Sequence, residues 1–369
     1  MTIQIEFDTR SLLKDLKDPK YIYEIKENKQ SLFIIRKPKS NKGRPSFLTT
    51  PKKIKISPEA VGLIVGEGYM GSHFVFANSN EKAIDEILFF LKQFKMPLKF
   101  YLEISVKNQP DEFVKICKKF WQEHLHLALD RIRLRKEFNS EVQYGTLHIN
   151  ANSIILANLL KKVIEVSKNK AENNKAIATS YLIGILAAEG NINIKKKTNC
   201  VYMVRISASK KKERNHYKKC LKKVGIKIFC KDMPTISKKE GIKRGWKTKF
   251  GRAGAVIISK WDNFIKILDL NLLKLSKDKM DKFSIHILQN KFTKQFLDIS
   301  PFIGKEFRIK TLQNHLNLSS RHVCRLLTLF KKGYVNRRKK KNFYLYKLNN
   351  NYIRIYNKLI STKNQIGFV

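Results

Sequence analysis

The sequence predicts an α+β protein made of two related units with roughly four strands each, followed by a smaller helical module. Three observations predict this class. An apolar helical run ending in Glu-Gly occurs twice, similar helical and strand-like segments follow each copy, and the pattern changes after about residue 285. The chain has 369 residues, more than one hydrophobic core usually organises, so several domains are expected.

Residues 1–56 are expected to form a basic N-terminal segment. Its last part, RKPKSNKGRPSFLTTPKKIKI (36–56), is rich in Lys and Arg and interrupted by Gly and Pro. This composition favours a loop or arm lying on a polyanion. A solvated, partly mobile terminus is the alternative.

The first repeat is expected at 57–168. It opens with the motif AVGLIVGEG, and the strand at 99–107 shows the clearest alternation of apolar and polar residues. Patterns typical of helices and strands follow the motif in this order: strand 72–78, helix 80–94, strand 99–107, helix 113–121, strands 131–138 and 142–149, and helix 153–166.

A polar, shapeless linker is expected at 169–176 and a second repeat at 177–280. The second motif is LIGILAAEG, and the elements after it repeat the order of the first unit: strand 201–207, basic helix 211–225, strand 226–230, strand 255–259 and helix 261–268. Duplication of one unit is the economical interpretation.

A winged-helix-like module is predicted at 285–350, with a C-terminal tail at 351–369. A short helix and turn precede a second helix whose apolar residues have helical spacing, and a β-hairpin with a basic tip follows. From 305 to 347 there are thirteen Lys and Arg and one acid, Glu306. We therefore expect contact with nucleic acid, and deletion of 285–369 is expected to leave the two repeats folded. The candidate contact residues are Arg321, Arg325, Lys331, Lys332, Arg337 and Arg338.

The charge of the whole chain indicates a polyanionic partner. There are 76 Lys and Arg against 30 Asp and Glu, a formal net charge of +46. Such self-repulsion opposes compaction unless an anionic partner is bound. No apolar run reaches the ~18 residues of a membrane span, so nucleic acid is favoured over a membrane. The five cysteines form no CxxC pair, which predicts reduced thiols in an intracellular protein.

Small residues recur at the same positions of both motifs. Gly62 and Gly66 in the first copy correspond to Gly184 and Ala188 in the second, and residues four apart share one helix face. Glycine inside a helix costs up to ~1 kcal/mol relative to alanine, so a packing reason is expected. We expect the two helices to pack closely as a pseudo-twofold pair.

Each motif helix ends in a glutamate, Glu67 or Glu189, and the two lie 122 residues apart, as do Gly62 and Gly184. A carboxylate at a helix C-terminus meets the negative end of the macrodipole, at a cost of roughly 0.3–1 kcal/mol. A divalent cation would remove this cost, and Mg²⁺ favours carboxylates with phosphate oxygens. The alternative is that each glutamate simply ends a buried helix at the surface.

The predicted strands also carry polar residues, most of them cations, that alternate with apolar residues. One sheet face would then be core and the other polar, able to reach phosphates and base edges. The alternating residues are Lys107, Arg131, Arg133, Arg135, Gln143, Arg205, Lys227 and Lys231.

These features resemble the LAGLIDADG homing endonucleases in their single-chain, two-repeat form. Residues 60–68 and 182–190 match the motif position by position, and the resemblance covers about 57 to 275. Val65 and Ala187 stand where the name motif has its first Asp, which is not the metal-binding position. Both functional acids are Glu where Asp is common.

The resemblance implies two αββαββα repeats packed through their motif helices, with sheets that bind a long double-stranded DNA site. It implies metal-dependent cleavage of both strands, with Glu67 and Glu189 as catalytic residues and ligands of Mg²⁺ or another divalent cation. Lys260 is the implied catalytic lysine, with His148 or Lys136 as the candidate in the first repeat. One chain supplies both half-sites, so a monomer is expected.

Two other functions remain open at this stage. Similar folds joined to a helix-turn-helix occur in non-catalytic transcription regulators of the WhiA type. An intron RNA maturase would use the same basic surface on RNA. The Lys-, Asn- and Ile-rich usage indicates an A+T-rich genome, which fits a prokaryotic or organellar source. The expected location is the cytoplasm or nucleoid of a prokaryote, or an organelle.

Overall fold

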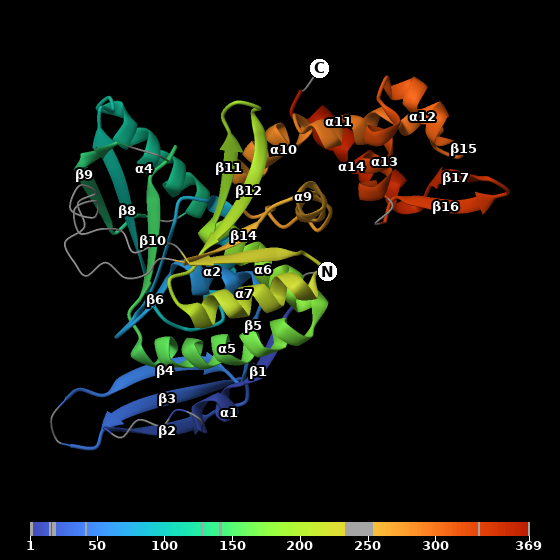
Figure 1. Ribbon diagram of the computed structural model, residues 1–369. Coiled ribbons are helices and arrows are strands. Elements are labelled where there is room, and N and C mark those ends of the chain that lie inside the picture. The colour runs from blue at the N-terminus through green and yellow to red at the C-terminus, as the bar shows by residue number, and fades with distance from the viewer. Residues whose placement is uncertain are drawn as a thin grey trace. The chain divides into compact units, whose positions relative to one another are not determined.

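The computed structural model describes residues 3–14, 16, 20–40, 43–126, 128–139, 142–232, 254–330 and 333–367 (Figure 1). Contacts between Cα atoms divide the chain into two compact units. The first contains Met1–Gly190, Lys210–Val224 and Lys274–Ser276. The second contains Asn191–Ser209, Gly225–Leu273 and Lys277–Val369.

Two apolar helices lie at the centre of the first unit. Helix α2 (Pro58–Glu67) begins after Ser57, whose side chain accepts a hydrogen bond from the Ala60 N–H. Helix α6 (Lys175–Glu189) begins after Asn174, which caps its first turn in the same way. The two helices pack against each other along their lengths. The predicted pairing of the motif helices is therefore confirmed.

A five-stranded sheet follows α2. Its strand order is β6 (Gly68–Met70), β7 (Phe74–Asn78), β10 (Thr146–Ala151), β8 (Leu98–Lys107) and β9 (Arg131–Asn139). Helices α3 (Glu81–Leu91), α4 (Glu112–Leu125) and α5 (Ile154–Asn173) pack against it. Burial alternates along the strands, so one face is core and the other is polar.

The first repeat contains an insertion relative to the αββαββα order. Strand β9 runs parallel to β8, and α4 connects them, whereas β10 pairs antiparallel with the other edge of β8. Parallel neighbours need such a crossover connection. Helix α4 and strand β9 therefore add one edge strand to the sheet. The alternation of apolar and polar residues in the sequence does not show which strand β9 pairs with.

The N-terminal segment is folded, which corrects the prediction of a loop or arm. Strands β2 (Tyr21–Glu27), β3 (Ser31–Pro38) and β4 (Ser46–Pro51) form an antiparallel sheet. Strand β1 (Ile5–Asp8) pairs with β5 (Lys53–Ile56), and helix α1 (Thr9–Lys14) joins this edge to α5. Gly43 and Pro45 lie between β3 and β4, and Pro38 and Pro51 are the last residues of these two strands, so the sequence composition is typical of a loop.

Residues 169–176 are helical except for a single break, so the predicted shapeless linker is also corrected. Helix α5 continues to Asn173, and Asn174 both ends it and caps α6. Helix α7 (Lys211–Lys223) packs on α5 and α6 in the same unit.

The second unit contains the four-stranded sheet of the second repeat. Its strand order is β11 (Gly190–Lys195), β12 (Cys200–Ser207), β14 (Gly254–Ile258) and β13 (Ile228–Asp232). Helix α9 (Trp261–Asp269) follows β14. With α6 and α7, these elements give the predicted αββαββα order for the second repeat.

The last part of the chain has the predicted winged helix-turn-helix. Helix α11 (Lys291–Asp298), the 3-10 turn η1 (Ser300–Phe302) and strand β15 (Glu306–Phe307) precede α12 (Ile309–Leu316) and α13 (Ser320–Phe330). Strands β16 (Val335–Lys340) and β17 (Phe343–Leu348) form the wing, and β15 pairs with β17.

This module shares its core with the second repeat. The Trp261 indole of α9 donates a hydrogen bond of 2.9 Å to Thr293 Oγ1 and contacts the rings of Phe296 and Phe330. Deleting 285–369 would expose this tryptophan. The second repeat therefore shares packing with the segment that this deletion removes, and whether the two repeats fold without it stays a prediction.

The predicted C-terminal tail is a helix, α14 (Asn350–Gln365), which follows β17. Helix α10 (Lys277–Leu288), which comes before α11 in the chain, belongs to the same unit and contacts α14. Tyr352 is buried and donates a hydrogen bond of 2.6 Å from its hydroxyl to the Phe296 carbonyl. Within the residues described, no helix has the length and apolar character needed to span a membrane.

We predict that Gly62→Ala or Gly184→Ala destabilises the first unit by about 1–3 kcal/mol, because overpacking forces backbone shifts. A Cβ at Gly62 would lie 2.3 Å from the Tyr181 carbonyl oxygen, and one at Gly184 would lie 2.1 Å from that of Glu59. Denaturant unfolding measures the change.

Gly71→Ala is the matched control. The three atoms nearest to its added Cβ belong to the Tyr69 side chain, which is exposed and can turn away. Equal stability of the Gly62 and Gly71 variants would contradict the close backbone contact.

Candidate functional site

The site begins with the backbone contact between α2 and α6. In addition to the two glycines near the middle, Gly66 lies against Ala188, whose Cβ would be 2.4 Å from a Cβ at Gly66. That added Cβ would also lie 3.3 Å from Glu189 Cγ. The C-terminal ends of the two motif helices therefore lie side by side, as the sequence pattern predicts.

Glu67 and Glu189 are the last residues of their helices. Glu67 is exposed and is followed at once by β6, whereas Glu189 is half-buried and is followed by β11. In both helices the next residue is a glycine that donates its N–H to the carbonyl four residues earlier. Both carboxylates thus stand at helix ends that carry partial negative charge.

The carboxylate oxygens of Glu67 and Glu189 suit a hard divalent cation that also binds phosphate. Within the described residues there is no cluster of three or more His, Cys, Asp or Glu side chains suited to holding a metal. Mg²⁺ commonly uses one or two carboxylates, with substrate phosphates and water as its other ligands. Two glutamates at adjoining helix ends fit that pattern.

Tyr217 of α7 is a neighbour of this site that the sequence did not reveal. The side chain is buried, and this burial raises the pKa of its hydroxyl, with further increases from the charges of Glu213 and Glu189. The hydroxyl therefore stays protonated at neutral pH. The only sequence signal is its place on the apolar side of a strongly basic helix.

The polar face of the first sheet carries three of the predicted arginines. Arg131, Arg133 and Arg135 of β9 stand beside Tyr101, Glu103 and Ser105 of β8 in register. Glu103 Oε1 lies 2.9 Å from Arg135, and its Oε2 lies 3.6 Å from Arg133. All three arginines are exposed. Glu103 therefore holds two arginines in place on a face where the positive charges would otherwise repel one another.

His148 of β10 lines a pocket on this face together with Tyr101, Glu103, Arg131 and Arg133. Burial lowers the pKa of its imidazole, and the charge of Glu103 partly opposes the decrease. Its Nε2 is buried without a hydrogen-bond partner among the described residues. Lys136, the other candidate in this repeat, is exposed on β9.

The remaining candidates on the strands are placed as follows. Lys107 is exposed at the end of β8, and Gln143 donates from its side chain to Tyr144 Oη. Arg205 is half-buried on β12, and Lys227 is exposed just before β13. The side chain of Lys231 lies outside the described residues.

Lys260 has an unusual backbone conformation. It lies in the second unit two residues after the end of β14, is exposed, and has φ +80° and ψ +143°. This region of the Ramachandran plot is used almost only by glycine and costs a residue with a side chain about 1–3 kcal/mol. A strained lysine at the end of the fourth strand is the type of position that carries function.

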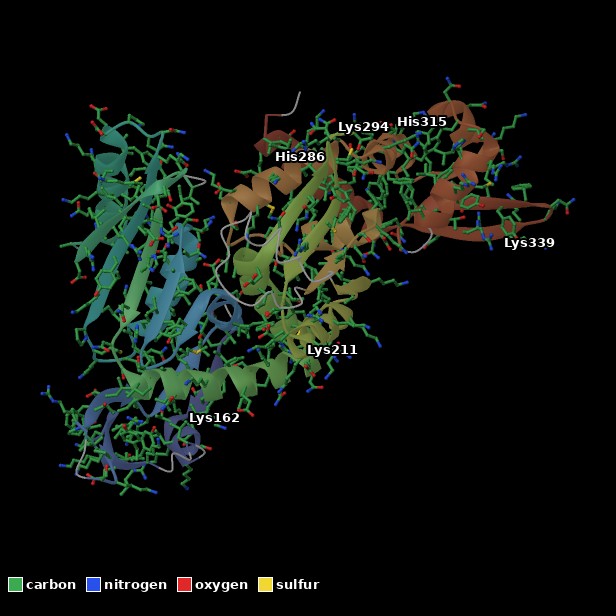
Figure 2. All side chains as sticks on the ribbon, turned by 60° about the vertical axis from the view of Figure 1, so that its left-hand side comes forward. Lys162, Lys211, His286, Lys294, His315 and Lys339 are labelled. Atoms are coloured by element: carbon green, nitrogen blue, oxygen red, sulfur yellow. The ribbon has the colours of Figure 1, made fainter. Side chains whose placement is uncertain are left out.

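The wing and the second helix of the C-terminal module are basic and exposed. Arg321 and Arg325 lie on the open side of α13. On β16, Arg337 stacks over the Tyr344 ring at 4.1 Å, and Arg338 pairs with Glu306 at 2.6 Å. Figure 2 labels Lys339 on the same hairpin. Lys331 and Lys332 lie outside the described residues.

A cysteine, a histidine and a glutamate form a chain between α5 and α7 that is structural. His216 Nδ1 lies 2.9 Å from Glu172 Oε1, and Cys220 Sγ lies 3.8 Å from His216 Nε2. Cys220 is fully buried, and burial raises the pKa of its thiol to about 12. A buried, protonated thiol is a poor nucleophile, so this arrangement joins the two helices.

The other end of α2 has a second pair of carboxyl groups. Glu59 is buried, and its Oε1 accepts from Lys274 Nζ at 3.1 Å. Glu86 of α3 accepts a hydrogen bond from the Ser57 hydroxyl. Burial raises the pKa of Glu86; the Ser57 hydrogen bond opposes this, and the charge of Glu59 adds to it.

Comparison with known proteins finds only remote structural similarity. No protein-family profile and no curated protein sequence matches the chain. The N-terminal LAGLIDADG domain of DUF199/WhiA has 14% identity and a TM-score of 0.33, covering 60% of this chain and 83% of its own.

Two other solved structures are similar to the same degree. I-DmoI in complex with DNA and Mn has 13% identity and a TM-score of 0.34, covering 58% of this chain and 94% of its own. Full-length DUF199/WhiA from Thermatoga maritima has 13% identity and a TM-score of 0.34, covering 75% and 91%. Identity this low assigns no function, so the function of this chain rests on its own residues.

We predict that Glu86→Gln stabilises the protein at pH 7. Because the folded-state pKa of Glu86 lies above the ordinary value of 4.5, the folded state holds its proton more tightly. The stability that this proton contributes is therefore full below about 4.5 and is lost as pH rises from there through the higher folded-state pKa, and the glutamine variant does not lose it. Denaturant midpoints of the parent and of the Glu86→Gln variant, measured from pH 4 to pH 8, test this. The two sets of midpoints should converge at the acid end.

Glu123→Gln is the control, because Glu123 is 67% exposed and only weakly paired with Lys119. A Glu86 variant less stable than the parent at pH 7 would show that Ser57 and Lys274 favour the anion over the neutral acid.

Proposed function

We propose that the protein is a metal-dependent endonuclease that hydrolyses phosphodiester bonds in both strands of a long double-stranded DNA site. One observation carries the proposal: α2 and α6 pack backbone to backbone, so that the helix ends that carry Glu67 and Glu189 lie side by side. Both helices end in an acid at the negative end of the helix dipole. Binding a divalent cation together with phosphate oxygen atoms would explain why both helices end in an acid.

Glu67 and Glu189 would hold Mg²⁺ or another divalent cation together with phosphate oxygens of the DNA. When bound, such a cation stabilises the charge that develops on the phosphate and activates water. The protein's own contribution is positional. The helix contact fixes the two carboxylates, and each adjoining strand leads from its carboxylate into a sheet.

The polar sheet face would bind the duplex. Exposed arginines on β9 can reach phosphates or base edges, and Arg contacts guanine in the major groove. Glu103 keeps Arg133 and Arg135 extended over the face before DNA arrives, which lowers the entropic cost of binding. Two repeats in one chain would supply both half-sites, so a monomer is proposed.

The winged module would extend the bound site. Arg321 and Arg325 occupy the open side of α13, the helix that enters the major groove in helix-turn-helix proteins. Arg337 and Arg338 on the wing would contact phosphates beside it. Counterion release by these cations makes the affinity fall as salt rises.

A non-catalytic regulator of the WhiA type is the competing proposal, because the winged module would serve it equally well. The two glutamates distinguish the proposals, since binding alone gains nothing from acids that repel DNA. An RNA maturase would bind folded intron RNA and need neither glutamate.

We predict that Glu67→Gln and Glu189→Gln each abolish cutting of one strand, and that the double variant binds the target without cutting. Glutamine removes the charge that holds the cation while keeping the side-chain size. The measurement is Mg²⁺-dependent cleavage of a randomised duplex library, and of the DNA flanking the gene with any intron removed.

Glu165→Gln is the charge-matched control, because Glu165 is an exposed acid on α5 paired with Lys162. Normal cutting by the Glu67/Glu189 double variant would refute the assignment. Selective DNA binding without cleavage by the parent protein would favour the regulator, and tight binding only to folded intron RNA would favour the maturase.

We further predict that Lys260→Gly raises the free energy of unfolding by about 1 kcal/mol while reducing cleavage, because it relieves backbone strain and removes the proposed catalytic cation. Lys260→Met removes the same charge and keeps the strain. It should reduce cleavage equally without the gain in stability.

Thermal unfolding and single-turnover cleavage of the two variants separate the roles. Full cleavage by both variants would leave Lys260 with no catalytic role.

A further inference from the structure

The sheet formed by β2, β3 and β4 has one covered face and one bare face. On the covered face, Leu32, Ile34 and Leu48 are buried, and Tyr23 Oη accepts a hydrogen bond from Asn158 of α5. Figure 1 shows this sheet packed beneath α5. Residues of the opposite parity point away from α5, so their side chains form a separate outer face.

The outer face carries a stacked pair of aromatic rings. Phe33 and Phe47 have ring centroids 5.8 Å apart and planes inclined by 12°. They are 37% and 53% exposed, and Ile22 on the same face is 51% exposed. Both rings therefore present apolar surface to solvent, although their sheet already has a buried core on its other side.

A polar pocket adjoins this aromatic pair. Ser31 and Thr49, the neighbours of Phe33 along and across the sheet, line it together with Lys29 and Lys95. The N–H of Lys95 donates to the Thr49 carbonyl, which fixes this part of the loop against the sheet edge. There is no acid among the residues that line the pocket.

The charges around the face favour an anionic occupant. Lys26 lies directly across from Phe33, and Lys29 and Lys95 flank the pocket; all three are exposed. Within the part of the chain described, the side chains of these lysines take part in no ion pair. The one acid on the face, Glu24, is paired with Lys37 at 2.7 Å. A second copy of a chain with net charge +46 would be repelled.

An occupant that is both anionic and able to stack on exposed rings is a nucleic-acid strand with unpaired bases. Duplex DNA keeps its bases stacked inside the helix, so their faces cannot reach the rings. Single strands bind by stacking bases on aromatic side chains while lysines contact the backbone.

The position of the face separates this strand from the proposed DNA duplex. Helix α5 contacts β4 on one side and β6 and β7 on the other. In Figure 2, Lys162 marks α5 between the small sheet and the large one. The outer face of β2–β4 thus points away from the arginine-bearing face within the same unit. RNA, whose loops and ends present unpaired bases, is the matching occupant.

We propose that the outer face of the β2–β3–β4 sheet binds single-stranded RNA. Two successive bases stack on Phe33 and Phe47, and the backbone phosphate beside them lies in the pocket between Lys29 and Lys95. This site is independent of Glu67 and Glu189, so it stands whether or not the protein cuts DNA.

The test uses the full-length protein and a fluorescent oligouridine RNA, which has little structure of its own. Phe33→Ala/Phe47→Ala should weaken binding roughly tenfold or more, because each stacked base contributes on the order of 1–3 kcal/mol. Phe33→Tyr/Phe47→Tyr keeps both rings and should retain the affinity. Ultraviolet crosslinking followed by mass spectrometry should place uridine on Phe33 or Phe47.

Phe89→Ala is the matched control, because Phe89 is an exposed ring (67%) on α3, which lies outside the small sheet. It should leave RNA binding unchanged. The Glu67→Gln/Glu189→Gln variant should also bind oligouridine like the parent, so failure of the endonuclease proposal is distinguishable from failure of this one.

Several results would overturn the proposal. Equal RNA affinity of the parent and the double alanine variant would exclude the rings as the binding surface. Equal or greater affinity for oligothymidine DNA, with the same loss in the variant, would make single-stranded DNA the occupant. A dimer that dissociates when the rings are removed, measured by sedimentation, would make the face an interface between copies.

Discussion

The contact between the backbones of α2 and α6 determines the geometry on which the proposed chemistry depends. Gly62 faces the Tyr181 carbonyl, and Gly184 faces that of Glu59, so the contact is reciprocal across the pair. With no side chains between them, the helices have little freedom to rotate or slide. The positions of the last residues are then fixed by the helices themselves. The helix contact thus brings the ends that carry Glu67 and Glu189 together.

The excess of positive charge is the second constraint, and several acids lie directly beside cations. Glu103 lies between two arginines, Glu172 between His216 and Lys219, and Glu306 next to Arg338. Exposed pairs of this sort add little stability individually. Their effect is to orient cations, which leaves the outward-facing Lys and Arg residues available to a polyanion.

Repetition and alternation are readable from the sequence, whereas three-dimensional neighbours are not. The doubled motif predicts the helix pair, and the alternation in 99–107 and 131–138 predicts a polar sheet face with Arg131, Arg133 and Arg135 on it. The N-terminal sheet escapes prediction because Gly and Pro between short strands look like loop composition. The parallel position of β9 escapes it because alternation does not specify pairing partners. The shared core around Trp261 depends on aromatic contacts between segments that look separate along the chain.

Helix α5 joins the two proposed binding faces of the first unit and also keeps them apart. An α-helix with its side chains is about 10–12 Å across, and each packed sheet adds further thickness. The Debye length at physiological salt is about 8 Å, so the charges of phosphates on the two faces are screened from each other. Anions bound on one side therefore do not repel anions on the other. Because the small sheet packs on α5 through buried residues such as Leu48, it is not a mobile arm that could reach the other side. The two faces consequently act as separate sites on one folded unit, and occupation of one leaves the other open.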